Sequence, residues 1–309
     1  MSYSSFQQAQ PVQISGSATS YFSSPSEVLD PALFDGTYLR PWVRNSILNL
    51  VTEHLSKFYE SPKKWATVWL AGSGVSYQWQ AQRDPADLDC LVGVDYVTFR
   101  GDNPEYRGLS DADISHIMND EFQEHLMPVT SSWNGFELTF YVNPGATDIS
   151  SINPYAAYDL THDKWTVEPD PRAAAPYTRA WQQKADTDLQ NTHSLIQHYS
   201  QALTDLQNAS NPAHRVNAEA HLHHVLSAAS SMYDEIHGNR RIAFSLAGAG
   251  YADFNNWRWQ AGKQSGAVPA LRTLRDYSRS ITSSNEVHTY GMELPSVDVL
   301  VRRAAIHRQ

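Results

Sequence analysis

The chain has 309 residues, of which 41% are hydrophobic and 18% are charged, and its formal net charge is −10. This length and apolar content suffice to bury the core of one large domain or two ordinary ones, and they exclude a disordered or collagen-like chain. The single cysteine, Cys90, excludes an intramolecular disulfide and a cysteine-built zinc site.

The first elements expected along the chain are an arm, a helix and a strand. Residues 1–26 are rich in Ser and Gln, and we expect them to form a flexible arm. Apolar residues recur every three or four positions over 42–59, which predicts an amphipathic helix. The β-branched and aromatic run 66–71 predicts a strand, which ends at the Gly-Ser-Gly sequence 72–74. A helical turn through Gln82 is expected next.

Two more strands enclose a further helix. The run 88–97 predicts a second strand. Ser110 can cap a helix whose apolar positions continue to Leu126. In 136–142 apolar and polar residues alternate, so this run predicts a strand with Glu137 on its polar face. The first half is therefore an alternation of helices and strands.

The second half of the sequence predicts helices. Residues at steps of three and four from 181 to 206 predict an extended helix, and a turn follows at 208–212. A return helix is expected over 216–236, ending near Gly238, so the two helices would form a hairpin. Residues 267–281 predict a further helix, and 293–309 could add a short last element whose orientation the sequence does not give.

These elements predict an α+β fold in three parts. The flexible arm covers 1–26, a mixed sheet with flanking helices covers 27–170, and a helical domain covers 171–309. No apolar run approaches the ~20 residues that span a membrane. The N-terminus lacks a basic stretch followed by an apolar one, so no secretory signal is expected. We expect a cytoplasmic protein with no membrane partner.

Three carboxylates are candidates for a metal centre. Asp87 and Asp89 are two positions apart on a predicted strand, so they project from the same face. Glu137 lies on the polar face of a later strand and could stand beside them. Carboxylates gathered on one sheet face repel one another unless cations neutralise them, and Mg²⁺ prefers such oxygen ligands. Asp148 is an alternative third ligand.

A turn precedes these carboxylates in the sequence. Gly72 and Ser73 follow a predicted strand directly, and thirteen residues separate Ser73 from Asp87. A turn of this kind offers backbone N–H groups and a hydroxyl, which can bind the phosphates of a nucleotide. We therefore expect a nucleotide-binding role for Gly72 and Ser73.

The order strand, Gly-Ser, Asp-x-Asp, third carboxylate resembles the polymerase-β-type nucleotidyltransferase superfamily, over roughly residues 66–142. The resemblance implies that Ser73 contacts the nucleotide phosphates and that Asp87, Asp89 and Glu137 hold two Mg²⁺ ions, or Mn²⁺ in their place. Two departures bear on the subfamily. Ala86 stands where many members have Ser before the first aspartate, and bulky residues at 77–80 replace a small Gly/Thr pair.

The helical half contains basic and aromatic residues in one stretch. Between 238 and 280 seven basic residues stand against two acidic ones. Arg258 and Lys263 interleave with aromatic residues over 251–263, where cations could meet phosphates and rings could stack on a base. Arg240 is a further candidate for the triphosphate. The alternative is that the aromatic residues are core and the cations lie on its rim.

Two other groups of residues suggest less specific roles. Histidines gather at 214–237, and His221 and His224 share a helix face that could bind a transition metal. No carboxylate or thiol completes the set, so surface histidines are the simpler interpretation. Cys90 alternates with Asp89 and is expected to be a small core residue.

The sequence therefore predicts a Mg²⁺-dependent nucleotidyltransferase. It would transfer a nucleoside monophosphate from an NTP to a hydroxyl of an acceptor and release pyrophosphate. The acceptor stays open among an RNA or tRNA end, a nucleotide, a protein and a small molecule. One alternative is a catalytically inactive nucleotide- or RNA-binding module on the same scaffold, and another is a helical interaction module.

Overall fold

The chain divides into two compact units. The computed structural model describes residues 11–79, 86–172, 174–292 and 294. The sheet unit comprises the described residues of Ala18–Ala175 and Ile242–Asp253, and the helical unit comprises those of Met1–Ser17, Pro176–Arg241 and Phe254–Ser296.

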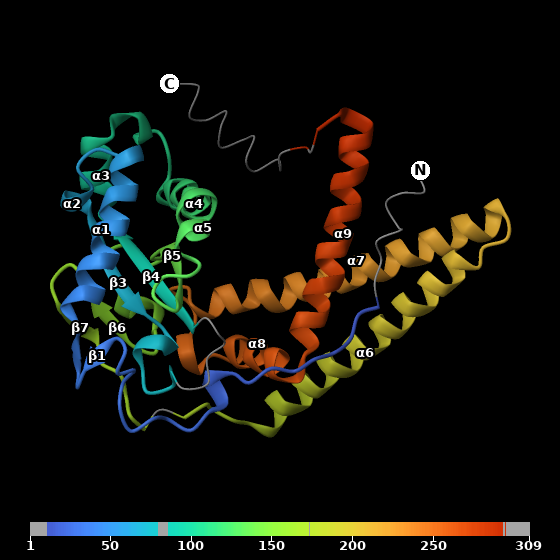
Figure 1. The fold of residues 1–309 in the computed structure, drawn as a ribbon, viewed down its shortest axis with the longest axis horizontal. Helices are drawn as coiled ribbons and strands as arrows, with labels where there is room; N and C mark the ends of the chain where they lie inside the picture. The colour runs from blue at the N-terminus through green and yellow to red at the C-terminus, as the bar shows by residue number, and fades with distance from the viewer. Residues whose placement is uncertain (1–10, 80–85, 173, 293, 295–309) are drawn as a thin grey trace. The chain divides into compact units, whose positions relative to one another are not determined.

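The sheet unit is built on a mixed five-stranded sheet. Its strands are β3 (Ala66–Ala71), β4 (Ala86–Val94), β5 (Phe136–Val142), β6 (Ala157–Asp159) and β7 (Lys164–Val167). They lie in the order β5-β4-β3-β6-β7 (Figure 1). β3 is antiparallel to β4 and to β6, and β6 is antiparallel to β7, whereas β4 and β5 are parallel. A separate two-stranded ribbon joins β1 (Phe34–Asp35) to β2 (Tyr38–Leu39).

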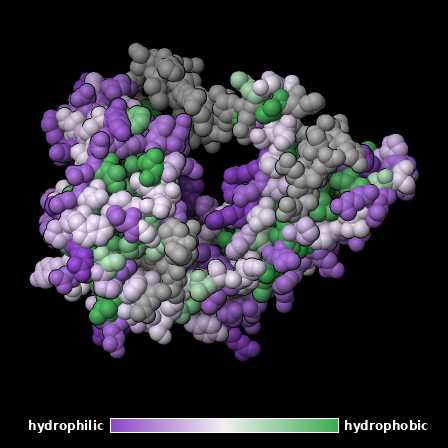
Figure 2. Space-filling view, viewed as in Figure 1, coloured by the Kyte–Doolittle hydropathy of each residue, from purple (hydrophilic) through white to green (hydrophobic). Residues whose placement is uncertain are grey.

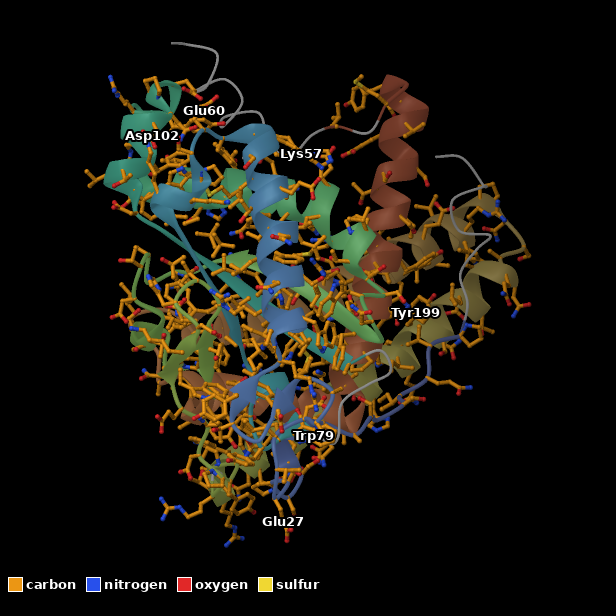
Figure 3. The ribbon with its side chains drawn as sticks, turned by 60° about the vertical axis from the view of Figure 1, so that its left-hand side comes forward. Glu27, Lys57, Glu60, Trp79, Asp102 and Tyr199 are labelled. Carbon is orange, nitrogen blue, oxygen red and sulfur yellow. The ribbon has the colours of Figure 1, made fainter. Side chains whose placement is uncertain are left out.

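Helices accompany this sheet in the first half of the chain. They are α1 (Pro41–Phe58), α2 (Pro62–Trp65), α3 (Tyr96–Asp102), α4 (Asp111–Glu121) and α5 (Met127–Thr130). Lys57 lies in the last turn of α1, and Glu60 follows the end of this helix (Figure 3). Ser110 caps α4, since its hydroxyl accepts from Asp113 N and the Asp113 carboxylate accepts from Ser110 N.

Apolar periodicity places the main core of the sheet unit on one face of the sheet. The apolar side of α1 is buried at Val43, Ile47, Val51 and Leu55. This stripe belongs to the same buried cluster as alternate strand residues, which include Leu70, Leu88, Cys90, Leu138 and Phe140. A smaller cluster, formed by Trp69, Ala71, Ile149, Ile152 and Ala157, contains the intervening positions of β3. Strand alternation thus separates two apolar clusters.

The helical unit consists of long helices around its own core. They are α6 (Arg179–Gln207), α7 (Pro212–Ala243), which continues into the sheet unit at its end, α8 (Phe254–Ser265) and α9 (Ala267–Tyr290). α6 and α7 form a helical hairpin (Figure 1). Tyr199, Leu222, Leu226, Leu271 and Leu274 are among its buried residues. In both units hydrophilic residues cover most of the surface that Figure 2 shows, and apolar residues form small groups there.

The structure confirms the predicted α+β fold, with a mixed sheet followed by helices. The predicted strands 66–71 and 136–142 have the expected bounds. The prediction of a strand over 88–97 was wrong at both ends, because β4 begins at Ala86 and ends at Val94. Asp95 ends it by capping α3, since its carboxylate accepts from Val97 N at 3.1 Å.

Other expectations differ in extent or lie outside the described residues. α7 continues five residues beyond Gly238, where the return helix was expected to end. In the expected flexible arm, Tyr21 is 1% exposed and donates to Tyr251 O at 3.0 Å, so this part of the segment belongs to the packed sheet unit. Residues 80–82 of the expected helical turn and nearly all of 293–309 lie outside the described residues.

Four short strands and four helices of the described residues were not predicted from the sequence. β1, β2, β6 and β7 have two to four residues each, which is too short for a periodic signal. The helices that were missed are α2, α3, α5 and α8. In the described part of the chain, no helix is long and apolar enough to cross a membrane.

Candidate functional site

Strand alternation places Asp87 and Asp89 on one face of β4. The residues between and after them, Leu88 and Cys90, are fully buried in the main core. The two aspartates are half-buried and project from the opposite face. Glu137 has the same position on β5, because it stands between the buried residues Phe136 and Leu138. All three carboxylates therefore lie on the sheet face away from the main core.

The parallel pairing of β4 with β5 brings two of these carboxylates into register. Asp87 pairs with Glu137, and Asp89 pairs with Thr139. Neighbouring strands are about 4.8 Å apart, so the Asp87 and Glu137 side chains start side by side. Thr139 Oγ1 donates to Asp89 Oδ1 at 3.0 Å, which fixes the orientation of that carboxylate. The sequence placed Thr139 on this face but gave no sign of its partner.

The Gly72–Ser73 turn packs against the same carboxylate. Ala71 is the antiparallel partner of Asp89, so the turn begins directly beside it. Gly72 has φ of +90°, and a Cβ at this position would lie 2.7 Å from Asp89 Oδ2. Glycine is required here both for the positive φ and for the close approach. A 3₁₀ turn, Ser73–Val75, follows and leaves Ser73 half-buried.

The chemistry of these donors fits a hard divalent cation. Asp87, Asp89 and Glu137 offer carboxylate oxygens, which Mg²⁺ prefers. Among the described residues, however, no group of three or more His, Cys, Asp or Glu side chains converges to hold a metal ion. The expected three-carboxylate cage is therefore not assembled in this structure. A Mg²⁺ site commonly uses one or two carboxylates with water and substrate phosphates, and the paired Asp87 and Glu137 are sufficient for that.

Cys90 lies directly behind the carboxylates. Its side chain is fully buried, as the sequence predicted. Burial raises the pKa of the Cys90 thiol well above its usual range, and the nearby Asp89 and Asp87 carboxylates raise the pKa further. The thiol is therefore an apolar core group rather than a nucleophile or a metal ligand.

The alternative third ligand, Asp148, lies elsewhere. It follows the C-terminal end of β5, whereas Glu137 is the second residue of that strand. Because β4 and β5 are parallel, Asp87 and Glu137 lie near the starts of their strands, and Asp148 lies beyond the other end. The Asp148 carboxylate is exposed and accepts from Ser150 N at 3.0 Å, so it caps a short 3₁₀ turn.

The structure places Arg258 inside the helical unit, which is at odds with its predicted role at a nucleotide. Its side chain is 4% exposed. Arg258 Nε donates to Asp188 Oδ2 at 2.6 Å, Nη2 donates to Asp188 Oδ1 at 3.0 Å, and Nη1 donates to Glu235 Oε1 at 2.7 Å. These contacts engage the guanidinium on three nitrogens, so Arg258 has little capacity left for a phosphate.

The other predicted cations of the helical unit are less buried. Lys263 lies at the C-terminal end of α8 and is half-exposed. The Arg240 guanidinium lies 5.3 Å from the ring centroid of Trp259, a cation–π contact. Both belong to the helical unit, whereas the carboxylates belong to the sheet unit.

The aromatic residues of 251–259 are mainly core. Trp257 is 2% exposed and Trp259 is 4% exposed, so neither presents a face on which a base could stack. Tyr251 belongs to the sheet unit, where it packs edge-on to Tyr155 with ring centroids 4.0 Å apart. The core alternative for these rings is therefore the correct one for both tryptophans.

The histidines of α7 form no metal site within the described residues. His221 has a ring neighbour on α6, His198, with centroids 6.2 Å apart. His237 belongs instead to a group of aromatic and basic residues near the C-terminal end of α7. His214, His223 and His224 are exposed, as the interpretation of surface histidines predicts, whereas His221 and His237 are half-buried.

Comparisons with protein-family models, with curated proteins and with solved structures found no match.

Proposed function

We propose that the chain is a Mg²⁺-dependent nucleotidyltransferase that transfers a nucleoside monophosphate from an NTP to an acceptor hydroxyl. The observation that carries the proposal is the register of β3, β4 and β5. It puts Asp87 beside Glu137 and places the Asp89 carboxylate against the Gly72 turn. Carboxylates and a Gly-Ser turn in one place are what metal-assisted phosphoryl transfer requires.

Each residue has a role in this proposal. Asp87 and Glu137 would hold the divalent cation, and Asp89, whose carboxylate Thr139 orients, would add a further oxygen ligand. When bound, Mg²⁺ would offset the charge of the phosphates and of the leaving pyrophosphate. Ser73 and the backbone of its turn would orient the triphosphate.

The reaction is a substitution at the α-phosphorus. A bond forms between the acceptor oxygen and the α-phosphorus, and the bond from that phosphorus to the bridging oxygen of the β-phosphate breaks. Pyrophosphate leaves with the electron pair of that bond. The acceptor hydroxyl loses its proton to a carboxylate of this face or to water.

Transfer of label from α-³²P NTP, measured together with pyrophosphate release, tests the proposal. All four NTPs are tested with RNA ends, nucleotides, proteins and small alcohols as acceptors, in Mg²⁺, in Mn²⁺ and in EDTA. We expect pyrophosphate release that requires the divalent metal ion and that is abolished by Asp87→Asn. Glu137→Gln should lower the rate by orders of magnitude, with partial recovery at high Mg²⁺ or Mn²⁺.

Matched variants separate the proposed site from general damage. Asp148→Asn removes the same charge as Asp87→Asn but lies beyond the other end of the strands, so it should leave the rate unchanged. Thr139→Val frees the Asp89 carboxylate and should weaken the apparent Mg²⁺ affinity by about 10- to 100-fold. Circular dichroism verifies that each variant is folded. A folded Asp87→Asn variant with undiminished release would refute the assignment.

An inactive nucleotide-binding module is the competing outcome of the same experiment. NTP with Mg²⁺ would then raise the melting temperature of the wild-type protein, but no pyrophosphate would appear with any acceptor.

A further inference from the structure

A group of basic side chains gathers in the helical unit. We name it the arginine cluster. Its members come from the end of α7 and the first half of α9 and are His237, Arg240, Arg241, Arg272 and Arg275. The sequence pointed to Arg240, but it did not show that two arginines of α9 lie near the same pair of rings.

Two buried rings form the base of the cluster. Tyr233 is 3% exposed and Trp259 is 4% exposed. The imidazole of His237 stacks on the ring of Tyr233, with ring centroids 5.6 Å apart and planes inclined by 17°. The centroid of the same imidazole lies 5.2 Å from that of the Trp259 ring. His237 follows Tyr233 by one helical turn of α7, so these two rings share a helix face.

The same rings orient the guanidinium groups. Arg275 lies 4.6 Å and Arg272 lies 5.9 Å from the ring centroid of Tyr233, and Arg240 lies 5.3 Å from that of Trp259. Arg272 Nε also donates to Tyr233 Oη at 3.2 Å. Cation–π contacts with a buried ring restrict the positions of these groups before any ligand binds.

Positive charge dominates at this place. Burial lowers the pKa of His237, and the charges of Arg240, Arg241, Arg275 and Arg272 lower it further. All four guanidinium groups therefore act on a single imidazole. Two exposed carboxylates lie opposite, since Asp234 and Asp276 lie 3.1 and 4.0 Å from nitrogens of Arg275. Both of these carboxylates contact Arg275, one of the four arginines that act on His237.

We propose that the arginine cluster binds a compact oligophosphate, such as inorganic triphosphate or the triphosphate group of a nucleotide. Guanidinium groups donate paired N–H bonds that match phosphate oxygens. Arg272 and Arg275 lie over Tyr233 and Arg240 lies over Trp259, and His237 contacts both rings. These cations therefore gather at one place, which suits a small anion of high charge. Both rings are buried and offer no face to a base, so single-stranded nucleic acid lacks the stacking that it commonly uses.

The inference does not rest on the proposed nucleotidyltransferase function. It uses only residues of the helical unit, and its test needs neither metal nor acceptor. The cluster could therefore bind an oligophosphate even if the carboxylates of the sheet unit catalyse nothing.

Isothermal titration with inorganic triphosphate in EDTA tests this inference, with sulfate at equal ionic strength as the comparison. Arg272→Gln and Arg279→Gln form a matched pair, because both arginines are exposed on α9 and only Arg272 belongs to the cluster. We expect triphosphate to bind the wild type and to bind Arg272→Gln about tenfold more weakly. This loss corresponds to one charge-assisted hydrogen bond. Arg279→Gln should change the affinity less than twofold.

A spectroscopic titration locates the anion independently. A bound oligophosphate should raise the pKa of His237, which is followed by the NMR signal of its imidazole and assigned with His237→Gln. No binding of triphosphate, equal effects of the two arginine variants, or an unchanged His237 pKa would overturn the proposal.

Two further ligands distinguish the sources of the phosphates. ATP tests whether a nucleotide binds through its triphosphate group, and its affinity should be close to that of inorganic triphosphate. A short single-stranded RNA with a 5′ hydroxyl tests the nucleic-acid backbone. If this RNA binds more tightly than triphosphate and Arg272→Gln weakens it, the site recognises RNA and the assignment to a compact oligophosphate is wrong.

Discussion

The two units arrange their charged side chains in opposite ways. In the helical unit, the buried Arg258 meets the buried Asp188 with two hydrogen bonds, and Lys184 Nζ donates to the same carboxylate at 3.0 Å. In the sheet unit, Asp87 and Glu137 stand side by side on parallel strands, so like charges are neighbours. The first arrangement pairs opposite charges, whereas the second places like charges side by side.

This difference separates a structural role from a functional one. A buried ion pair with satisfied hydrogen bonds is explained by packing alone. Like charges opposite each other in a sheet cost about 0.2–1 kcal/mol and bring the fold no benefit. Features that oppose stability concentrate at functional sites, so Asp87 and Glu137 are the better candidates for chemistry.

Breaking the compensated pair should have the largest effect on stability. Arg258→Leu leaves Asp188 buried with only Lys184 as a partner, and the free energy of unfolding should fall by about 3–5 kcal/mol. Urea unfolding of the helical unit, followed by the fluorescence of its tryptophans, measures this loss. The double variant Arg258→Leu/Asp188→Leu removes both charges and should recover much of the stability. If it recovers none, packing rather than charge explains the effect.

The sheet unit contains a buried histidine, His54, and protonation of its imidazole at low pH should destabilise the unit. His54 is 5% exposed and lies between the rings of Phe58 and Phe122. Burial lowers the pKa of His54 to about 4, and the charges of Lys57 and His125 contribute. Since this pKa is below the unfolded value of about 6.5, the unfolded chain binds the proton more tightly.

The contribution of His54 to stability is therefore complete above pH 6.5 and decreases as the pH falls toward 4. The loss should reach about 3 kcal/mol at most. Denaturant unfolding of the wild type and of His54→Leu between pH 7 and pH 4 measures it. Leu keeps the apolar contacts but does not titrate, so its stability should depend less on pH. Parallel pH profiles for the two proteins would show that other groups cause the acid sensitivity.

The smallest expected effect concerns the accumulated charges. Without metal, Asp87→Asn should raise the free energy of unfolding of the sheet unit by about 0.2–1 kcal/mol, because it relieves the repulsion by Glu137. With Mg²⁺ the ranking should reverse if the pair binds the cation, since only the wild type is stabilised by the bound ion. Thermal melts with and without Mg²⁺ measure both effects. A variant less stable than the wild type in EDTA would contradict the repulsion.

Much of the sheet could be predicted because its signal is local. Alternation in 136–142 indicated which residues face the core, and burial of Phe136, Leu138 and Phe140 agrees with it. The same alternation put Asp87 and Asp89 on one face. Helix ends were less certain, since Gly238 is a plausible end in the sequence but lies within α7.

Contacts between residues that are far apart in the sequence could not be predicted from local patterns. The prediction for Arg258 considered its aromatic neighbours along the chain, but its partner Asp188 is 70 residues away and on another helix. A basic residue among aromatic ones has the same local pattern whether it faces solvent or a buried carboxylate. The packing of α6 against α8 decides between these two environments.

The sequence by itself determined the order of the elements, the faces of the strands and the residue types that could bind a cation, because these follow from local periodicity and composition. Only the tertiary structure decided that Asp87 pairs with Glu137, that Asp89 contacts Thr139 and the Gly72 turn, and that Arg258 is neutralised. The physical reason is that strand register and helix packing depend on the whole core, whereas alternation specifies a face and leaves the neighbour on that face open.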